Sequence, residues 1–146
     1  MSLELENKIA ELAVYKFKNG LYCSEAILAA FNEICNLKLS KDVLKIATGF
    51  GAGFGAAKCV CGSLTGGQLV ISLLKGRTDP SESEVPAFES AKRLHDEFKN
   101  EFKGTCCRTL TKDVIWGEPE HHESCIKYVD GAVRITYRII QENLDF

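Results

Sequence analysis

The chain has 146 residues, of which 18 are Lys or Arg and 20 are Asp or Glu, so its formal net charge is −2. This balance, without a long block of one charge sign, gives no electrostatic basis for partners such as nucleic acid or an anionic membrane. A chain of this length buries enough surface to fold without disulfide cross-links, so we expect one helical domain over residues 1–146.

Two stretches bear on the cellular compartment. Residues 1–13 alternate acidic and apolar side chains and lack the basic start and apolar run of a secretory signal. Residues 59–74 form an uncharged stretch of 16 residues, but it contains three glycines and is shorter than the roughly 20 apolar residues of a spanning helix. We therefore expect a cytoplasmic protein, in which cysteines are more often free, catalytic or metal-bound than permanently bridged.

The first third of the chain shows two apolar patterns with helical spacing. The first runs from Leu5 to Phe17 and stops at Asn19-Gly20, and the second runs from Cys23 to the neighbourhood of Asn36. These patterns predict two amphipathic helices, with Cys23 on the apolar stripe of the second.

The middle of the chain predicts a short helix, a break and a longer helix. Ser40 is a suitable N-cap for a helix through Ala47, and the four glycines within 49–55 interrupt it. We expect the longer helix over about 61–75, with Gly76 as its C-terminal glycine.

The last part of the chain predicts three further helices. Residues 79–82 resemble a helix opening, although Pro86 could move the start later, and apolar spacing continues to Phe102. Thr105 is expected to cap a short helix, residues 116–119 to form a loop, and residues 120–143 to form the final helix. Since helical periodicity explains every apolar segment, we predict an all-α fold, a compact single-domain bundle of about five to seven helices.

Several of the seven cysteines fall where these helices begin. A helix N-terminus carries partial positive charge and free N–H groups, so a thiol there ionises more easily than usual. The adjacent Cys106 and Cys107 point about 100° apart on a helix, which disfavours a bond between them and places Cys107 on the inner face. If the helical inner faces converge, several sulfurs come within reach of one another. The candidate catalytic cysteines are Cys23, Cys61, Cys107 and Cys125.

Two other patterns have both a functional and a structural interpretation. The candidate cofactor-binding glycines are Gly51, Gly53, Gly62 and Gly66, which could leave N–H groups free for an anion or simply allow tight turns and close helix packing. A dinucleotide fingerprint in this region is rejected because no strand precedes it. The spacing of His121 and Cys125 suits a metal, but a solvated helix start is the favoured interpretation.

The ordered cysteines and glycines also resemble a known family. The segments that carry the resemblance are 22–26, 48–53, 61–66, 107–110 and 125–129. They are similar to the C_GCAxxG_C_C family of small redox-active proteins, over about residues 21–133. The resemblance implies a compact helical protein with a thiol or electron redox role, whose four family cysteines match Cys23, Cys61, Cys107 and Cys125. Here glycine follows Cys61 instead of preceding it, and Cys35, Cys59 and Cys106 are additional.

Three functions remain open. The first is thiol–disulfide exchange, as in a thiol-disulfide oxidoreductase, in which Cys61 or Cys23 forms a reversible disulfide with Cys107 or Cys125 and a redox partner protein supplies or takes the electrons. The second is a zinc or iron–sulfur site, with candidate ligands Cys23, Cys59, Cys61, Cys107 and Cys125. The third is a helical interaction module with packing cysteines, and a homodimer is compatible with all three.

Overall fold

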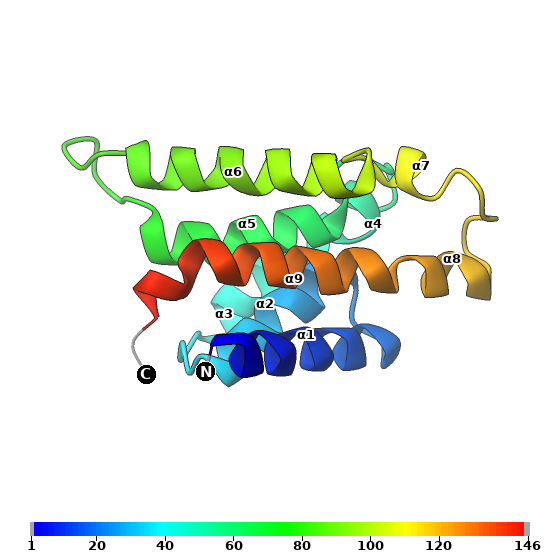
Figure 1. Ribbon diagram of the computed structural model, residues 1–146, viewed down its shortest axis with the longest axis horizontal. Helices are drawn as coiled ribbons and strands as arrows, with labels where there is room; N and C mark the ends of the chain where they lie inside the picture. The colour runs from blue at the N-terminus through cyan, green and yellow to red at the C-terminus, as the bar shows by residue number, and fades with distance from the viewer. Residues whose placement is uncertain (1, 145–146) are drawn as a thin grey trace.

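The computed structural model describes residues 2–144, which contain helices and loops but no strand (Figure 1). Five helices of 12 to 18 residues form the body: α1 (Ser2–Lys18), α2 (Cys23–Ile34), α5 (Gly62–Lys75), α6 (Val85–Phe102) and α9 (Ile126–Ile140). The shorter segments are α3 (Lys41–Leu44), the 3₁₀ helix η1 (Lys45–Phe50), α4 (Gly51–Phe54), α7 (Cys107–Leu110), α8 (Pro119–Ser124) and the 3₁₀ helix η2 (Gln141–Asn143). The predicted all-α fold is confirmed.

The body is a bundle in which α5 and α9 lie between α6 on one side and α1 on the other (Figure 1). Helix α9 packs against α1, α5 and α6, and α2 packs against α1 and α5. The side chains that fill these contacts are fully buried, and the largest include Ile9, Phe31, Ile71, Phe98 and Val133. Burial of this apolar surface is the main favourable contribution to folding.

Close approach of α2 to α5 depends on small residues. A Cβ atom added to Gly66 would lie 3.0 Å from the Cα of Ser24 and 3.2 Å from the Cβ of Ile27. The Ser24 hydroxyl in turn donates a buried hydrogen bond of 2.8 Å to the carbonyl of Ala47. These contacts hold the first turn of α2 against α5 and η1.

A buried carboxylate joins α1 to α9. The side chain of Glu6 is 7% exposed and accepts hydrogen bonds from Arg134 at 3.0 Å and from Arg138 at 3.2 Å. Arg134 also pairs with Asp130 at 2.9 Å and donates to Asn7 at 2.7 Å. Because a buried charge is costly unless it is paired, this network fixes the register of the two helices.

Most helix boundaries agree with the sequence pattern. Helices α1 and α2 end where Asn19-Gly20 and Asn36 were expected to stop them, and Ser40 caps α3 by accepting a hydrogen bond of 3.2 Å from the Val43 amide. Helix α5 begins directly after Cys61 and ends at Gly76.

Other boundaries differ from the first expectation. Helix α6 begins at Val85, which agrees with the alternative that Pro86 moves the start later than 79–82, and the side chain of Asp79 accepts hydrogen bonds from Ser81 and closes a local turn before it. The predicted helix through Ala47 ends as α3 at Leu44 and continues as the 3₁₀ helix η1. The N-cap of α7 is Cys106 and not Thr105. The predicted final helix over 120–143 is divided at Cys125, which ends α8 and begins α9, and it finishes as the separate 3₁₀ helix η2.

Among residues 2–144, no helix is both long enough and apolar enough to span a membrane. The short segments α4, α7 and α8 gather at one end of the bundle, where α5 and α9 also begin (Figure 1). This end carries most of the cysteines.

Candidate functional site

Four free cysteines lie at the starts of helical segments that meet at one end of the bundle. Cys23 is the first residue of α2, Cys61 is the N-cap of α5, Cys107 is the first residue of α7, and Cys125 joins α8 to α9. The first three are only 4–8% exposed, and Cys125 is partly exposed. Cys61 lies close enough to Cys23, Cys107 and Cys125 to raise the pKa of each of them. We call these four residues the inner cluster.

Local contacts hold the inner cluster in place. A Cβ atom added to Gly62 would clash with the sulfur of Cys23, so only glycine fits at that position. The amide of Cys61 donates a hydrogen bond of 2.7 Å to the carbonyl of Thr105, which joins the start of α5 to the loop before α7. The hydroxyl of Tyr128 donates to the carbonyl of Leu110 at 2.8 Å and thereby fixes α7 against α9.

Cys61 and Cys107 form an asymmetric pair. A hydrogen bond from the Cys107 thiol is the main reason that the pKa of Cys61 is lowered to about 7, with further help from the N–H groups of Ser63 and Leu64 at the start of α5. The same hydrogen bond, together with burial, raises the pKa of Cys107 well above its ordinary range. When the pair loses one proton, Cys61 is therefore the residue that becomes the thiolate and Cys107 stays protonated.

The other two inner cysteines stay protonated. Burial, followed by the charge of Cys61, raises the pKa of Cys23 to about 12, although the N–H group of Ala52 opposes this shift. Burial and then Cys61 raise the pKa of Cys125 to about 11. Above a pH of about 7 the inner cluster thus has one thiolate, on Cys61, next to three thiols, an arrangement suited to disulfide formation.

Ser63 is a polar side chain that the sequence analysis did not single out. Its hydroxyl is completely buried and has no nitrogen or oxygen partner, yet its position near Cys61 helps to lower the pKa of that thiol. A serine two residues after a helix-capping cysteine was the available signal. Ala52 was not singled out either. Only its backbone N–H acts, by opposing the rise in the pKa of Cys23, and a side-chain pattern gives no signal for such a contact.

Cys59 and Cys106 lie outside the inner cluster and form a disulfide, with 4.3 Å between their Cα atoms. Cys59 is exposed and Cys106 partly exposed, so we call this bridge the outer disulfide. As expected, Cys106 is not bonded to its neighbour Cys107, which is buried and free. Cys59 was predicted as a metal ligand, but in this state its sulfur is bonded to Cys106 and is not available to a metal. The sequence signal for this disulfide is that Cys59 lies next but one to Cys61 and that Cys106 is adjacent to Cys107, so each member of the inner pair has a second cysteine beside it.

The candidate cofactor-binding glycines pack against protein atoms. A Cβ atom added to Gly51 would lie 2.6 Å from the side chain of Tyr22. One added to Gly53, where φ is +66°, would lie 2.5 Å from the amide nitrogen of Cys59. Gly62 faces Cys23 and Gly66 faces α2. These contacts support the close-packing interpretation, and cofactor binding by the four glycines stays a prediction.

The two histidines near Cys125 take part in packing. His121 contacts Trp116 in a tilted arrangement with 4.0 Å between the ring centroids and accepts a hydrogen bond from the Gly117 amide, while His122 stacks on Phe17 at 4.1 Å. His122 is nonetheless exposed, so the helix start is in contact with solvent and is also held in place by these rings. Within residues 2–144, no three His, Cys, Asp or Glu side chains are grouped as metal ligands, and the zinc or iron–sulfur interpretation stays a prediction.

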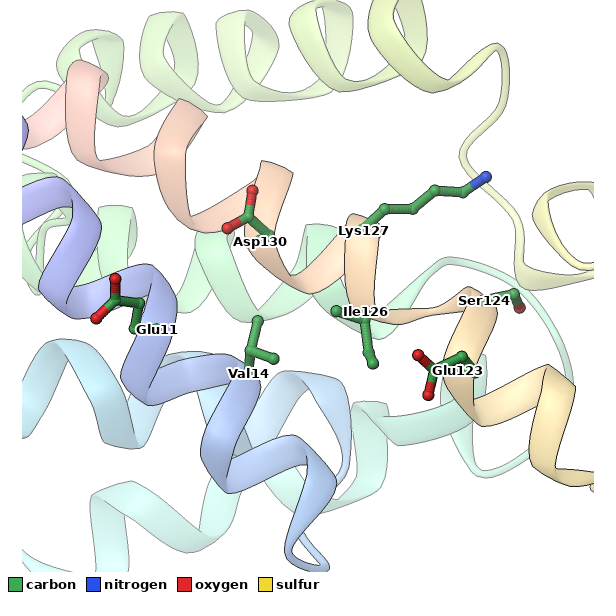
Figure 2. Close-up of a pocket in the computed structure, with 7 residues that line it drawn as sticks. All are labelled: Glu11, Val14, Glu123, Ser124, Ile126, Lys127 and Asp130. Carbon is green, nitrogen blue, oxygen red and sulfur yellow. The ribbon is translucent and has the colours of Figure 1, made fainter.

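A cavity of about 590 Å³ lies between α1 and the junction of α8 with α9 (Figure 2). Val14 and Ile126 are its apolar lining residues, and the remaining ones are Glu11, Glu123, Ser124, Lys127 and Asp130. Cys125 is next to two lining residues in the sequence but does not itself line the cavity. The cavity is therefore separate from the inner cluster.

The seventh cysteine, Cys35, lies at the other end of α2. It is 6% exposed within the hydrophobic core, and burial raises its pKa to about 11. Cys35 therefore acts as a core side chain, as buried free cysteines commonly do.

Comparison with known proteins identifies a matching family. The family model described as "Putative redox-active protein (C_GCAxxG_C_C)" matches residues 21–139, a range that includes the inner cluster and the outer disulfide. No curated protein and no solved structure matches the chain.

Proposed function

Because the chain belongs to the C_GCAxxG_C_C family of redox-active proteins, we propose that its inner cluster carries out thiol–disulfide exchange, with Cys61 as the nucleophile and Cys107 as the resolving thiol. The observation that carries this proposal is the placement of Cys61, the N-cap of α5, beside the buried Cys107 at the start of α7, and the lowering of the pKa of Cys61 to about 7 by Cys107 supports it. A thiol with a pKa near ambient pH combines a large thiolate fraction with good nucleophilicity.

The exchange needs a disulfide on a partner as the electron acceptor. The Cys61 thiolate attacks one sulfur of that disulfide, and the other partner sulfur leaves as a thiolate. Cys107 then loses its proton to the solvent and attacks the sulfur of Cys61. The products are a Cys61–Cys107 disulfide and a partner with two thiols, so two electrons pass from this protein to the partner.

Thiol counting tests this proposal. The structure has five free cysteines, and oxidation in glutathione buffers should reduce the count to three, with peptide mapping placing the new bridge between Cys61 and Cys107. Adding dithiothreitol should restore both thiols. Replacing Cys107 by Ser should trap a mixed disulfide on Cys61, whereas replacing Cys35 by Ala should leave the oxidation unchanged. Absence of a reversible two-thiol loss would contradict the proposal.

The same sample distinguishes a metal site from an exchange site. A metal site stays the alternative because thiolates suit zinc and iron–sulfur clusters, although no three His, Cys, Asp or Glu side chains within residues 2–144 are grouped as metal ligands. Metal analysis of anaerobically purified protein should find no stoichiometric zinc or iron if exchange is the function. We further propose a cytoplasmic location and a protein redox partner.

A further inference from the structure

The outer disulfide and the Cys61–Cys107 pair join the same two segments of the chain. Cys59 and Cys61 lie on the segment before α5, and Cys106 and Cys107 lie at the start of α7. Backbone hydrogen bonds flank the outer disulfide on both sides. The amide of Arg108 donates to the carbonyl of Lys58 at 3.0 Å, and the amide of Cys61 donates to the carbonyl of Thr105 at 2.7 Å. The two cysteine pairs are thus held next to each other.

The two pairs differ in access to solvent. Cys61 is 4% and Cys107 is 7% exposed, whereas Cys59 is exposed and Cys106 partly so. Thiol–disulfide exchange requires the attacking sulfur to approach the attacked sulfur directly, so access limits its rate. An external thiol or disulfide therefore meets the outer pair before the inner one.

Two positive side chains belong to the segments that the outer disulfide joins. Lys58 precedes Cys59 and has its ammonium 4.6 Å from the centre of the Trp116 ring, and Arg108, two residues after Cys106, donates a hydrogen bond of 3.3 Å to the carbonyl of Ala57. A positive charge close to a sulfur stabilises its thiolate, and a sulfur that leaves as a stable thiolate leaves faster.

From this arrangement we propose that the outer disulfide is an exchange port, through which an external disulfide oxidises the buried Cys61–Cys107 pair. This inference rests on the proposed function of the inner cluster, and in it the outer disulfide takes the place of the partner's disulfide as the group that Cys61 attacks. The Cys61 thiolate attacks one sulfur of the outer disulfide and displaces the other as a thiolate. Cys107 then attacks the sulfur of Cys61 and releases the second outer sulfur. The protons lost by Cys61 and Cys107 are regained by Cys59 and Cys106, so one disulfide replaces another.

The port is regenerated by a second exchange. An external disulfide reacts with the two outer thiols, restores the Cys59–Cys106 bridge and leaves as two thiols. The net reaction transfers two electrons from the inner pair to the external disulfide, and no further oxidant is needed.

Oxidation kinetics test the port with oxidised glutathione as the probe. The fully reduced protein and the C59S/C106S variant are mixed with the probe, quenched with acid at intervals, alkylated and mapped by mass spectrometry. In the unmodified protein the Cys59–Cys106 bridge should form first and the Cys61–Cys107 bridge second. In the variant the inner bridge should form roughly tenfold more slowly, because the probe must reach buried sulfurs.

Each outcome has a separate meaning. Equal rates of inner-bridge formation in the two proteins, or a glutathione adduct on Cys61 before the outer bridge forms, would overturn the port and leave the proposed function intact. An unmodified protein that forms the outer bridge but never the inner one would overturn the proposed function. Circular dichroism checks the fold of the variant, with C59A/C106A as the alternative, and the order of bridge formation in the unmodified protein tests the port without any variant.

Discussion

The interface between α1 and α9 and the inner cluster each bury a group that carries negative charge, but they stabilise it by different means. Glu6 is paired with the guanidinium groups of Arg134 and Arg138. Cys61 is stabilised by the thiol of Cys107 and by N–H groups at the start of α5. Arginine cannot be deprotonated in proteins, so the first arrangement is permanent, whereas the Cys107 thiol can itself react. A buried anion beside a reactive thiol is suited to thiol–disulfide exchange, whereas a buried anion paired with cations is suited to holding two helices together.

Replacing Glu6 should have the largest effect on stability. The E6Q variant removes the buried charge between Arg134 and Arg138 and should lower the free energy of unfolding by roughly 2–3 kcal/mol, because both guanidinium groups lose their shared partner. Urea denaturation measures the change. E4Q is the matched control: Glu4 lies on the same helix, 75% exposed and paired only with Lys8, so its loss should cost at most about 0.5 kcal/mol. Equal losses in the two variants would contradict the structural role of Glu6.

A methyl group at position 62 should affect both stability and chemistry. In G62A the new Cβ meets the sulfur of Cys23 and lies 3.1 Å from the carbonyl of Phe50, so the free energy of unfolding should fall by roughly 1–2 kcal/mol. Thermal denaturation and alkylation of Cys61 should both change. In G49A, by contrast, the added atom has no neighbour within 4 Å and should alter neither measurement. A wild-type alkylation profile in G62A would show that Gly62 does not position the inner cluster.

The reactivity of Cys61 should depend on pH through its lowered pKa. The fraction of thiolate increases as pH rises through about 7, so the rate of iodoacetamide alkylation at Cys61 should rise with a midpoint there. In C107A the main cause of the lowered pKa is lost, and the midpoint should move to higher pH. Mass spectrometry of the alkylated peptide measures both curves. Identical midpoints would mean that Cys107 does not stabilise the thiolate.

Removing the Ser63 hydroxyl should have the smallest effect. In S63A the midpoint of Cys61 alkylation should move to higher pH, but by less than in C107A. The Ser63 hydroxyl lowers the pKa of Cys61 less than the Cys107 thiol does. Stability should be unchanged or slightly increased, since the buried hydroxyl has no nitrogen or oxygen partner to lose. A midpoint shift larger than that of C107A would reverse the assigned order of the two residues.

The helices were largely predictable, because apolar periodicity reports which face of a helix is buried. The division of the last helix at Cys125 was not, since it accompanies a tilted ring contact of His121 with Trp116 and stacking of His122 on Phe17, and Phe17 is distant in the sequence. The sequence left two starts open for α6, and the later one near Pro86 is found because the side chain of Asp79 closes a local turn that competes with a helix.

The candidate site was predictable in its members but not in its arrangement. Helix starts and the family resemblance identified Cys23, Cys61, Cys107 and Cys125, yet the pairing of Cys59 with Cys106 depends on how two loops meet in three dimensions. Hydrogen bonds between Lys58 and Arg108 and between Cys61 and Thr105 bring those loops together. Spacing along one chain carries no information on such contacts.

The burial of Cys35 has a practical consequence for the labelling experiments. It lies in the apolar core at the far end of α2 from the inner cluster, and its raised pKa disfavours the thiolate. Cys61 is equally buried but has a lowered pKa, whereas the buried Cys35 is also protonated, so a reagent modifies Cys35 mainly in molecules that have opened. The peptide that contains Cys35 serves as a built-in reporter of unfolding, against which every modification of the other thiols can be normalised in the same spectrum.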